Sequence, residues 1–243
     1  MGDSAGLIVI GFDLIFIVML RVLKMNKTMF VMSVACLASL GFHAQAADLS
    51  VKGTIAPVSC SFTITNSVFD YGRIDPNSLS PTRYTQLAKK TTPYSIKCAS
   101  NVKTTVAIRA SDNRASSRIP GMMLSLFGSN YKDTYNFGLG ATSQGQKIGG
   151  YLIHLRNSVA DGVAVGIVGS ENNGGYWHTN STQAVGHTSN LTAWRAGNVY
   201  APIKVNTVAG QIEVLPVINK TSELNMSNQI NLDGQATLEL RYL

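Results

Sequence analysis

The stretch that decides the fold is the last one, Ile230–Leu243, which reads INLDGQATLELRYL. Apolar and polar residues alternate along it, and Gly234 is the only gap in the apolar series. Because successive side chains of a strand point to opposite faces, this pattern predicts a half-buried β-strand that reaches the final residue. The apolar series is Ile230, Leu232, Ala236, Leu238, Leu240 and Tyr242. We expect the chain to end inside a sheet.

The residues before this stretch also read as strands and turns. Alternation predicts strands at 94–98 and 104–108 and a bent strand over 51–64, while the continuous apolar run 148–155 predicts a strand covered on both faces. A further strand is expected at 163–167, and two more around Ala209-Gly210 within 200–217. The least patterned segments, 112–128 and 170–198, are predicted to be long loops. No helical periodicity of ten or more residues follows residue 46, so the chain is predicted to be all-β.

The beginning of the chain indicates export. Met25–Ala46 has a basic start, an apolar stretch over 29–42 and the tripeptide Ala44-Gln45-Ala46, so it reads as a signal peptide cleaved before Ala47. Residues 1–24 do not fit that plan, because Asp13 interrupts their apolar run. We interpret them as an upstream start and Met25 as the initiator. The alternative is a transmembrane helix over 7–23, in which Asp13 would cost about 2.5–3.5 kcal/mol.

The mature chain, 47–243, is expected to be a single domain in the periplasm or at the cell surface. Its 17 Lys and Arg against 11 Asp and Glu give a net charge of +6, spread as single residues and pairs. Since no basic run resembles a nucleic-acid patch, we expect no nucleic-acid partner. A solvated basic surface is the favoured interpretation.

Two cysteines remain after cleavage, Cys60 and Cys98. A single pair in an oxidising compartment predicts a disulfide bond. A zinc site would need more ligands, and the spacing of a redox motif is absent. The bond is therefore expected to be structural.

Nothing in the sequence predicts an enzyme, a cofactor or a metal site. The nucleophile-elbow, zinc-protease and phosphate-loop motifs are absent, and Gly138-Leu139-Gly140 is read as a turn. His154 lies in an apolar strand and is expected to be an edge residue or a core residue with satisfied hydrogen bonds, and not a ligand. His178 and His187 share a loop without a metal-ligand spacing. Asp112 and Arg114 are predicted to form a turn with a local ion pair.

One loop has binding character. Tyr176, Trp177 and His178, with Trp194 further on, lie among Asn, Ser and Gly residues. Exposed aromatic rings in such company are suited to stacking on sugars. The favoured alternative is that Trp177 and Trp194 turn inward and hold the loop to the sandwich, because large aromatic residues are usually buried.

Together these residues resemble a family of signal-peptide-bearing periplasmic proteins of enterobacteria that are encoded in fimbrial operons and classed as a domain of unknown function. More distantly the chain is similar to chaperone–usher pilins, which share an early cysteine pair and a terminal strand with a penultimate tyrosine. The positions that carry the family resemblance are 70–72, Cys60 with Cys98, 112–114, 137–140, 145–149, 232–234 and 242–243. They span nearly the whole mature chain in order.

The resemblance implies an immunoglobulin-like, pilin-like β-sandwich that lacks one strand. Its partners would be a periplasmic pilus chaperone and an usher, with other fimbrial subunits and surface glycans as further partners. The chaperone or a donor strand would bind at the terminal strand, along Leu232, Ala236, Leu238, Leu240 and Tyr242. This chain would be a fimbrial-like structural subunit.

One departure from the pilins concerns the start of the mature chain. Only residues 47–50 precede the first expected strand, so the chain is expected to receive a strand and not to donate one, as a tip, terminal or minor subunit would. The alternative is a periplasmic binding or sensory domain that does not polymerise, with a link to nitrogen metabolism that the family association suggests.

Overall fold

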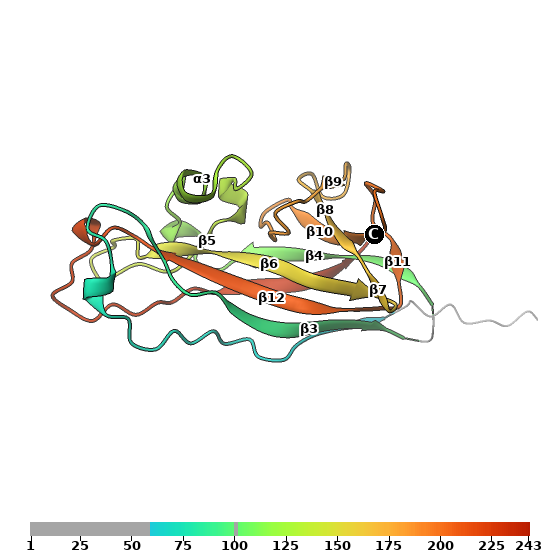
Figure 1. The fold of residues 1–243 in the computed structure, drawn as a ribbon, viewed down its shortest axis with the longest axis horizontal. Helices are drawn as coiled ribbons and strands as arrows, with labels where there is room; N and C mark the ends of the chain where they lie inside the picture. Colours follow the sequence, from blue (N-terminus) through green and yellow to red (C-terminus); the bar gives the residue numbers. More distant parts are fainter. Residues whose placement is uncertain (1–58, 100–101) are drawn as a thin grey trace, which may run out of the picture. The chain divides into compact units, whose positions relative to one another are not determined.

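The computed structural model describes residues 59–99 and 102–243, in which the strands form two antiparallel sheets. Figure 1 shows the sheets stacked as a β-sandwich. The expected signal peptide, the upstream segment and the first part of the bent strand lie outside the described residues.

The first sheet has seven strands among the described residues, with the central order β1-β3-β12-β6-β5. Its short strands β2 and β7 pair with β12 and β6. The bounds are Cys60–Ile64 (β1), Thr85–Gln86 (β2), Lys90–Cys98 (β3), Phe137–Gly138 (β5), Gly149–Ala160 (β6), Val163–Ala164 (β7) and Thr207–Ile218 (β12).

The second sheet has six strands in the described part of the chain, in the order β11-β4-β10-β8-β9, with β13 paired to β4. The bounds are Thr104–Asp112 (β4), Gly166–Ser170 (β8), His178–Thr179 (β9), Leu191–Arg195 (β10), Lys204–Val205 (β11) and Ala236–Tyr242 (β13). The short helical segments are Pro76–Ser78, Ala115–Ser117, Met122–Phe127 (α3), Asp133–Tyr135 and Thr221–Glu223.

The main core lies between the two sheets and follows the alternation of the sequence. Tyr94, Ile96 and Cys98 of β3 are buried while the residues between them are exposed. At the centre of this core Trp194 donates a hydrogen bond from its indole nitrogen to the Tyr94 hydroxyl, 3.2 Å away, and that hydroxyl is 2.8 Å from the Ser158 hydroxyl. The polar tips of two large aromatic residues are thus satisfied inside the core.

A chain excursion covers part of the outer face of the first sheet, and its helix α3 lies above the strands in Figure 1. The 112–137 segment, which contains α3, packs Met122 and Met123 onto Leu152 and Leu215 of the first sheet. This cover explains why β6 is buried at every position from Gly149 to Leu155. The prediction of a doubly covered strand there is confirmed.

Other boundaries differ from the sequence-based expectation. Residues 204–218 form the short β11 and the long β12, and Ala209-Gly210 is a bulge inside β12 instead of a turn. The segment 170–198 is not simply a loop, since it contains β9 and the central strand β10. Residues 163–167 are divided between β7 and β8, which belong to different sheets. In each case the outcome depends on which distant strands pair within a sheet. Local periodicity does not report such pairing.

The terminal strand is shorter than the alternating pattern. β13 begins at Ala236, so Ile230 and Leu232 are not part of it. Both side chains are nevertheless half-buried against the main core. The apolar alternation over 230–235 therefore reports contact with the core and does not report pairing to another strand.

Candidate functional site: an open edge between the two sheets

β13 forms one free edge of the sandwich. It pairs with β4 from Ala236 opposite Asp112 to Tyr242 opposite Val106, and no described strand pairs with its other side. Ala236, Leu238 and Leu240 are half-buried against the main core, while the residues between them are exposed. Since side chains alternate along a strand, the apolar series faces the interior and the polar series faces solvent.

β1 forms the facing edge in the other sheet. It pairs only with β3 among the described strands, from Cys60 opposite Cys98 to Ile64 opposite Tyr94. Cys60, Phe62 and Ile64 are half-buried against the same core. The Phe62 ring meets the Tyr94 ring edge-on, with centroids 6.3 Å apart. The bent strand predicted over 51–64 includes these three residues, but the sequence pattern did not identify them as a second edge facing β13.

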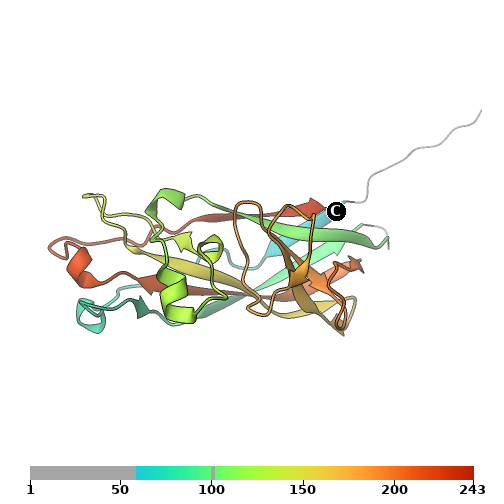
Figure 2. The same ribbon diagram turned by 90° about the horizontal axis from the view of Figure 1, so that it is seen from above.

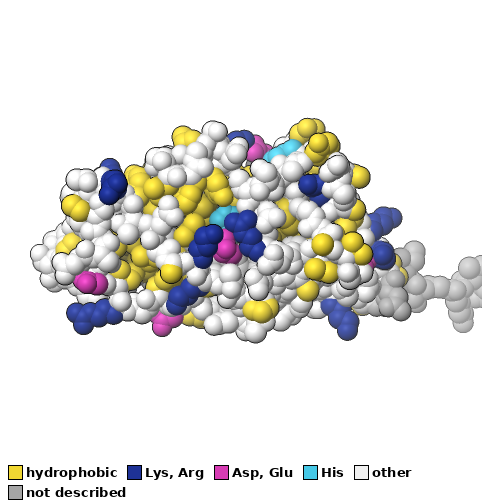
Figure 3. Space-filling view, viewed as in Figure 1, with side chains coloured by type: hydrophobic (Ala, Val, Ile, Leu, Met, Phe, Trp, Pro, Cys, Tyr) yellow, Lys and Arg dark blue, Asp and Glu magenta, His cyan; other side chains and the backbone are white. Residues whose placement is uncertain are grey.

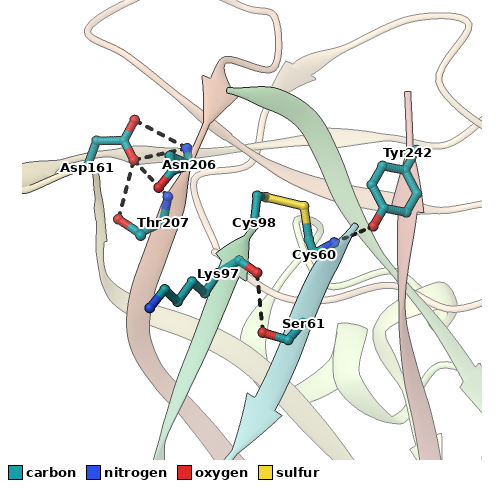
Figure 4. The surroundings of a disulfide bond; sticks show 8 residues. All are labelled: Cys60, Ser61, Lys97, Cys98, Asp161, Asn206, Thr207 and Tyr242. Carbon is teal, nitrogen blue, oxygen red and sulfur yellow. Dashed lines mark hydrogen bonds between the residues drawn. A yellow bond between two sulfur atoms is a disulfide. The ribbon is translucent and has the colours of Figure 1, made fainter. Parts of the chain in front are cut away.

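The two edges meet at one end, beside the disulfide bond. Figure 4 shows Cys60 of β1 between Cys98 of β3 and Tyr242 of β13. The Tyr242 hydroxyl accepts a hydrogen bond of 2.6 Å from the Cys60 backbone nitrogen, although half of the Tyr242 side chain is exposed. The Cys60–Cys98 bond confirms the predicted pairing and ties β1 to its sheet. Tyr242 therefore links β13 to the start of β1 at this end.

We call β1 and β13, with the half-buried apolar side chains between them, the open edge. Unpaired strand edges offer backbone donors and acceptors to another strand, and they are usually blocked in soluble proteins. An extended peptide laid along such an edge gains main-chain hydrogen bonds, and its alternate side chains pack on apolar side chains of the edge. The open edge therefore has the unpaired backbone groups and apolar side chains to which an added strand could bind.

Leu232, predicted to be part of this edge, lies before β13 in a segment that is fixed in another way. The Arg114 guanidinium forms a forked pair with the Asp233 carboxylate, at 2.9 and 3.0 Å. Its Nε atom also donates a hydrogen bond of 3.0 Å to the Asp233 backbone oxygen. A Cβ atom at Gly234 would lie 2.8 Å from the Tyr151 ring, so only glycine fits there. This segment anchors the start of β13.

The Asp112–Arg114 turn has different partners from those expected. The Asp112 carboxylate accepts a hydrogen bond from the Arg114 backbone nitrogen at 2.9 Å, which confirms the turn. Its ion-pair partner is Arg118, at 3.1 Å, whereas the Arg114 side chain pairs with Asp233. The predicted local ion pair was wrong, because the guanidinium of Arg114 reaches across to a segment far along the chain.

The structure separates the four residues of the candidate ligand loop. Trp194 is buried in the main core, and Trp177 is half-buried against the outer face of the second sheet. Tyr176 is 69% exposed and its ring stacks on the His178 ring, 6.4 Å away. They therefore do not form one aromatic surface.

A compact group of charged residues surrounds His154 on the outer face of the first sheet. The Glu213 carboxylate is 3.0 Å from the Arg156 guanidinium and 3.5 Å from His154 Nδ1. The latter contact lacks hydrogen-bond geometry, and neither ring nitrogen has a partner within the described chain. Burial lowers the pKa of His154 to about 4, and the charge of Arg156 contributes in the same direction. Figure 3 shows acidic, basic and histidine side chains together at the middle of this face, beside an apolar area.

His154 is thus a buried residue of a central strand, and not an edge residue. The expectation of satisfied hydrogen bonds was wrong, because the outer-face neighbours of the ring leave both nitrogens without a partner in the described chain. His187 is also buried, with its Nε2 atom 2.9 Å from Arg118 Nη1, and burial followed by that charge lowers its pKa. Over the described residues no cluster of three His, Cys, Asp or Glu side chains is arranged to hold a metal ion. In the same part of the chain no helix is long and apolar enough to span a membrane.

Comparisons with known proteins give two similarities. Residues 49–152 match a family model described as a protein of unknown function (DUF1120). The predicted resemblance to a domain of unknown function is confirmed at that level, and its fimbrial-operon and pilin parts stay predictions. Protein GltF of Escherichia coli (strain K12) is 25% identical over 241 residues, covering 87% of this chain and 94% of GltF. The chain is therefore similar to the DUF1120 family through its disulfide-bonded first half and to GltF along most of its length.

Proposed function

We propose that the protein is a fimbrial-like structural subunit of a chaperone–usher type surface fibre, completed by strand addition at the open edge. One observation carries the proposal. Two strands from different sheets, β1 and β13, face each other with unpaired edges in the described chain, and both direct half-buried apolar side chains inward. The sequence resemblance to proteins of fimbrial operons supports the same conclusion.

A strand placed in the open edge would complete the sandwich. Phe62 and Ile64 on one side and Leu238 and Leu240 on the other would become fully covered. Complete burial of such a side chain contributes about 1.5–3 kcal/mol relative to full exposure, and these residues still have part of that contribution to gain. The incoming strand would also satisfy the free backbone groups of β13.

The partners follow from this need for a strand. A periplasmic pilus chaperone would cover the edge after export, an usher would receive the complex, and another subunit would then supply the strand. The disulfide bond agrees with folding in an oxidising compartment, because cytosolic thiols are kept reduced. The signal peptide expected at 25–46 supports the same route.

The experiment compares two faces of β13. The mature chain is produced in the periplasm with a tagged pilus chaperone, and co-purification and periplasmic yield are measured. Leu240→Asp should abolish co-purification, because it places a carboxylate without a partner among the apolar side chains of the core, at a cost of several kcal/mol. Tyr242→Ala should reduce it through loss of the contact with Cys60. Glu239→Gln, on the exposed face of the same strand, is the matched control and should have little effect.

The contrary outcome is a chain that needs no partner. If the protein accumulates as a stable soluble monomer without a chaperone, and the outward-facing β13 amides are protected from hydrogen exchange, its own residues fill the open edge. That result would overturn the fimbrial proposal. It would favour the alternative of a periplasmic binding or sensory domain that does not polymerise.

A further inference from the structure

A cavity of about 500 Å³ lies at the end of the sandwich where two loops meet. One loop, 141–147, follows β5, and the other, 225–233, leads into β13; both lie at the left in Figure 2. Known small-molecule sites have volumes of roughly 300–1,000 Å³, so this cavity has the size of a ligand site. Most of its lining is polar without being charged: Thr142, Ser143, Gln144, Asn225, Asn228, Gln229 and Asn231.

Hydrogen bonds connect several amide groups of this lining. Asn225 donates from Nδ2 to Gln144 Oε1 at 3.1 Å and so joins the two loops. Gln229 donates from Nε2 to Asn231 Oδ1 at 2.7 Å. Each bond uses one half of an amide, so Gln144 Nε2 and Asn231 Nδ2 remain as donors and Gln229 Oε1 as an acceptor, without partners in the described chain. Gln144, Gln229 and Asn231 are exposed, so these donors and this acceptor are open to a molecule in the cavity.

The rest of the lining provides an apolar floor and no unpaired charge. Ile148 is buried, and Ile230 and Leu232 are half-buried against the main core. The single charged side chain, Asp233, is neutralised by its forked pair with Arg114, at 2.8 Å for the closest contact. An anionic or cationic ligand would find no free counter-charge in the lining. A ligand that matches the cavity is neutral, with many groups that both donate and accept.

We propose that this cavity binds a neutral saccharide. Sugar hydroxyls donate and accept at the same atom, which suits amides that have one free donor or acceptor each. The C–H face of a sugar ring is apolar and would lie on the isoleucine and leucine floor. The site contains none of the aromatic residues Tyr176, Trp177 and Trp194, and it does not require the open edge to be filled, so the proposal stands independently of the fibre.

The test uses the mature chain as it purifies, alone or with its chaperone. Lactose, maltotriose and chitotriose are the neutral probes, 3′-sialyllactose is the charged comparison, and binding is measured by calorimetry. At least one neutral sugar should bind at millimolar concentration, and more tightly than the charged one. Asn231→Asp keeps the acceptor used by Gln229 but loses the free donor and adds a charge, so affinity should fall about tenfold, equivalent to ~1.4 kcal/mol.

Asn198→Asp is the matched control, because it makes the same change at an exposed residue outside the lining. Its affinity for the sugar should equal that of the unmodified protein. The proposal is overturned if no neutral sugar of the panel binds, or if Asn231→Asp and Asn198→Asp bind equally well. Chaperone co-purification should be unchanged in both variants, which separates a failure of this site from a failure of the open edge.

Discussion

Acidification should destabilise the protein through His154. The ring lies on the outer face of β6, with Glu213 and Arg156 beside it and the Tyr131 ring edge-on at a centroid distance of 6.1 Å. It is almost completely buried and neither ring nitrogen has a hydrogen-bond partner in the described structure. The folded protein therefore holds this imidazole neutral, and protonation requires a buried charge or local opening.

The magnitude follows from the difference in pKa between the folded and unfolded chain. Burial, followed by the Arg156 charge, lowers the pKa of His154 from 6.5 to about 4. Between these pH values the unfolded chain binds more protons, so stability rises with pH in this window. The contribution is fully present above about pH 6.5 and is lost as the pH falls to about 4. At about 1.4 kcal/mol per pKa unit, the loss is about 3 kcal/mol.

The assay is urea unfolding of the disulfide-bonded mature chain at several pH values between 7 and 4. His154→Phe removes the titrating group while keeping an aromatic ring beside Tyr131, so the slope of stability against pH should be much shallower. Part of the slope should remain, because burial also lowers the pKa of His187. His178→Phe, in the half-buried β9, is the control. Equal pH slopes for the unmodified protein and His154→Phe would refute the reasoning.

Three further predictions concern other parts of the chain. Replacing both Cys60 and Cys98 with alanine should lower the free energy of unfolding by about 4 kcal/mol, from the chain-entropy cost of the 38-residue loop, and equal urea midpoints would contradict this. Gly149→Ala should strongly reduce folded yield, since its Cβ would lie 2.1 Å from the Val217 carbonyl oxygen; unchanged circular dichroism and yield would count against it. Mass analysis of periplasmic protein should find Ala47 at the amino terminus, and a membrane-bound species retaining residues 1–24 would exclude export by this signal.

Local pattern predicted the parts of the fold that depend on single strands. The alternation at Tyr94, Ile96 and Cys98 lies in β3. The apolar run 148–155 corresponds to the first part of β6, which is covered on both faces. The disulfide could be predicted because only two cysteines remain after the expected cleavage. In each case the burial of a residue follows from which face of its own strand it occupies.

Patterns failed where pairing with distant strands decided the outcome. β10 is central in its sheet, although its sequence lies in a polar stretch. It is only five residues long, and its pairing with β8 on one side and β4 on the other makes it a strand. The bulge at Gly210 was read as a turn, since a local break in alternation looks the same in both cases. Arg114 pairs with Asp233, a residue 119 positions away, and no local signal reports that contact.

The sequence by itself determined that β13 has one apolar and one polar face, because alternation is a property of the strand alone. Only the tertiary structure decided that β13 lies opposite β1 with an unpaired edge, and that the amides of two separate loops meet around one cavity. Both features arise where segments far apart in the chain come together. Their positions depend on the packing of two sheets against one core, and no single segment encodes that packing.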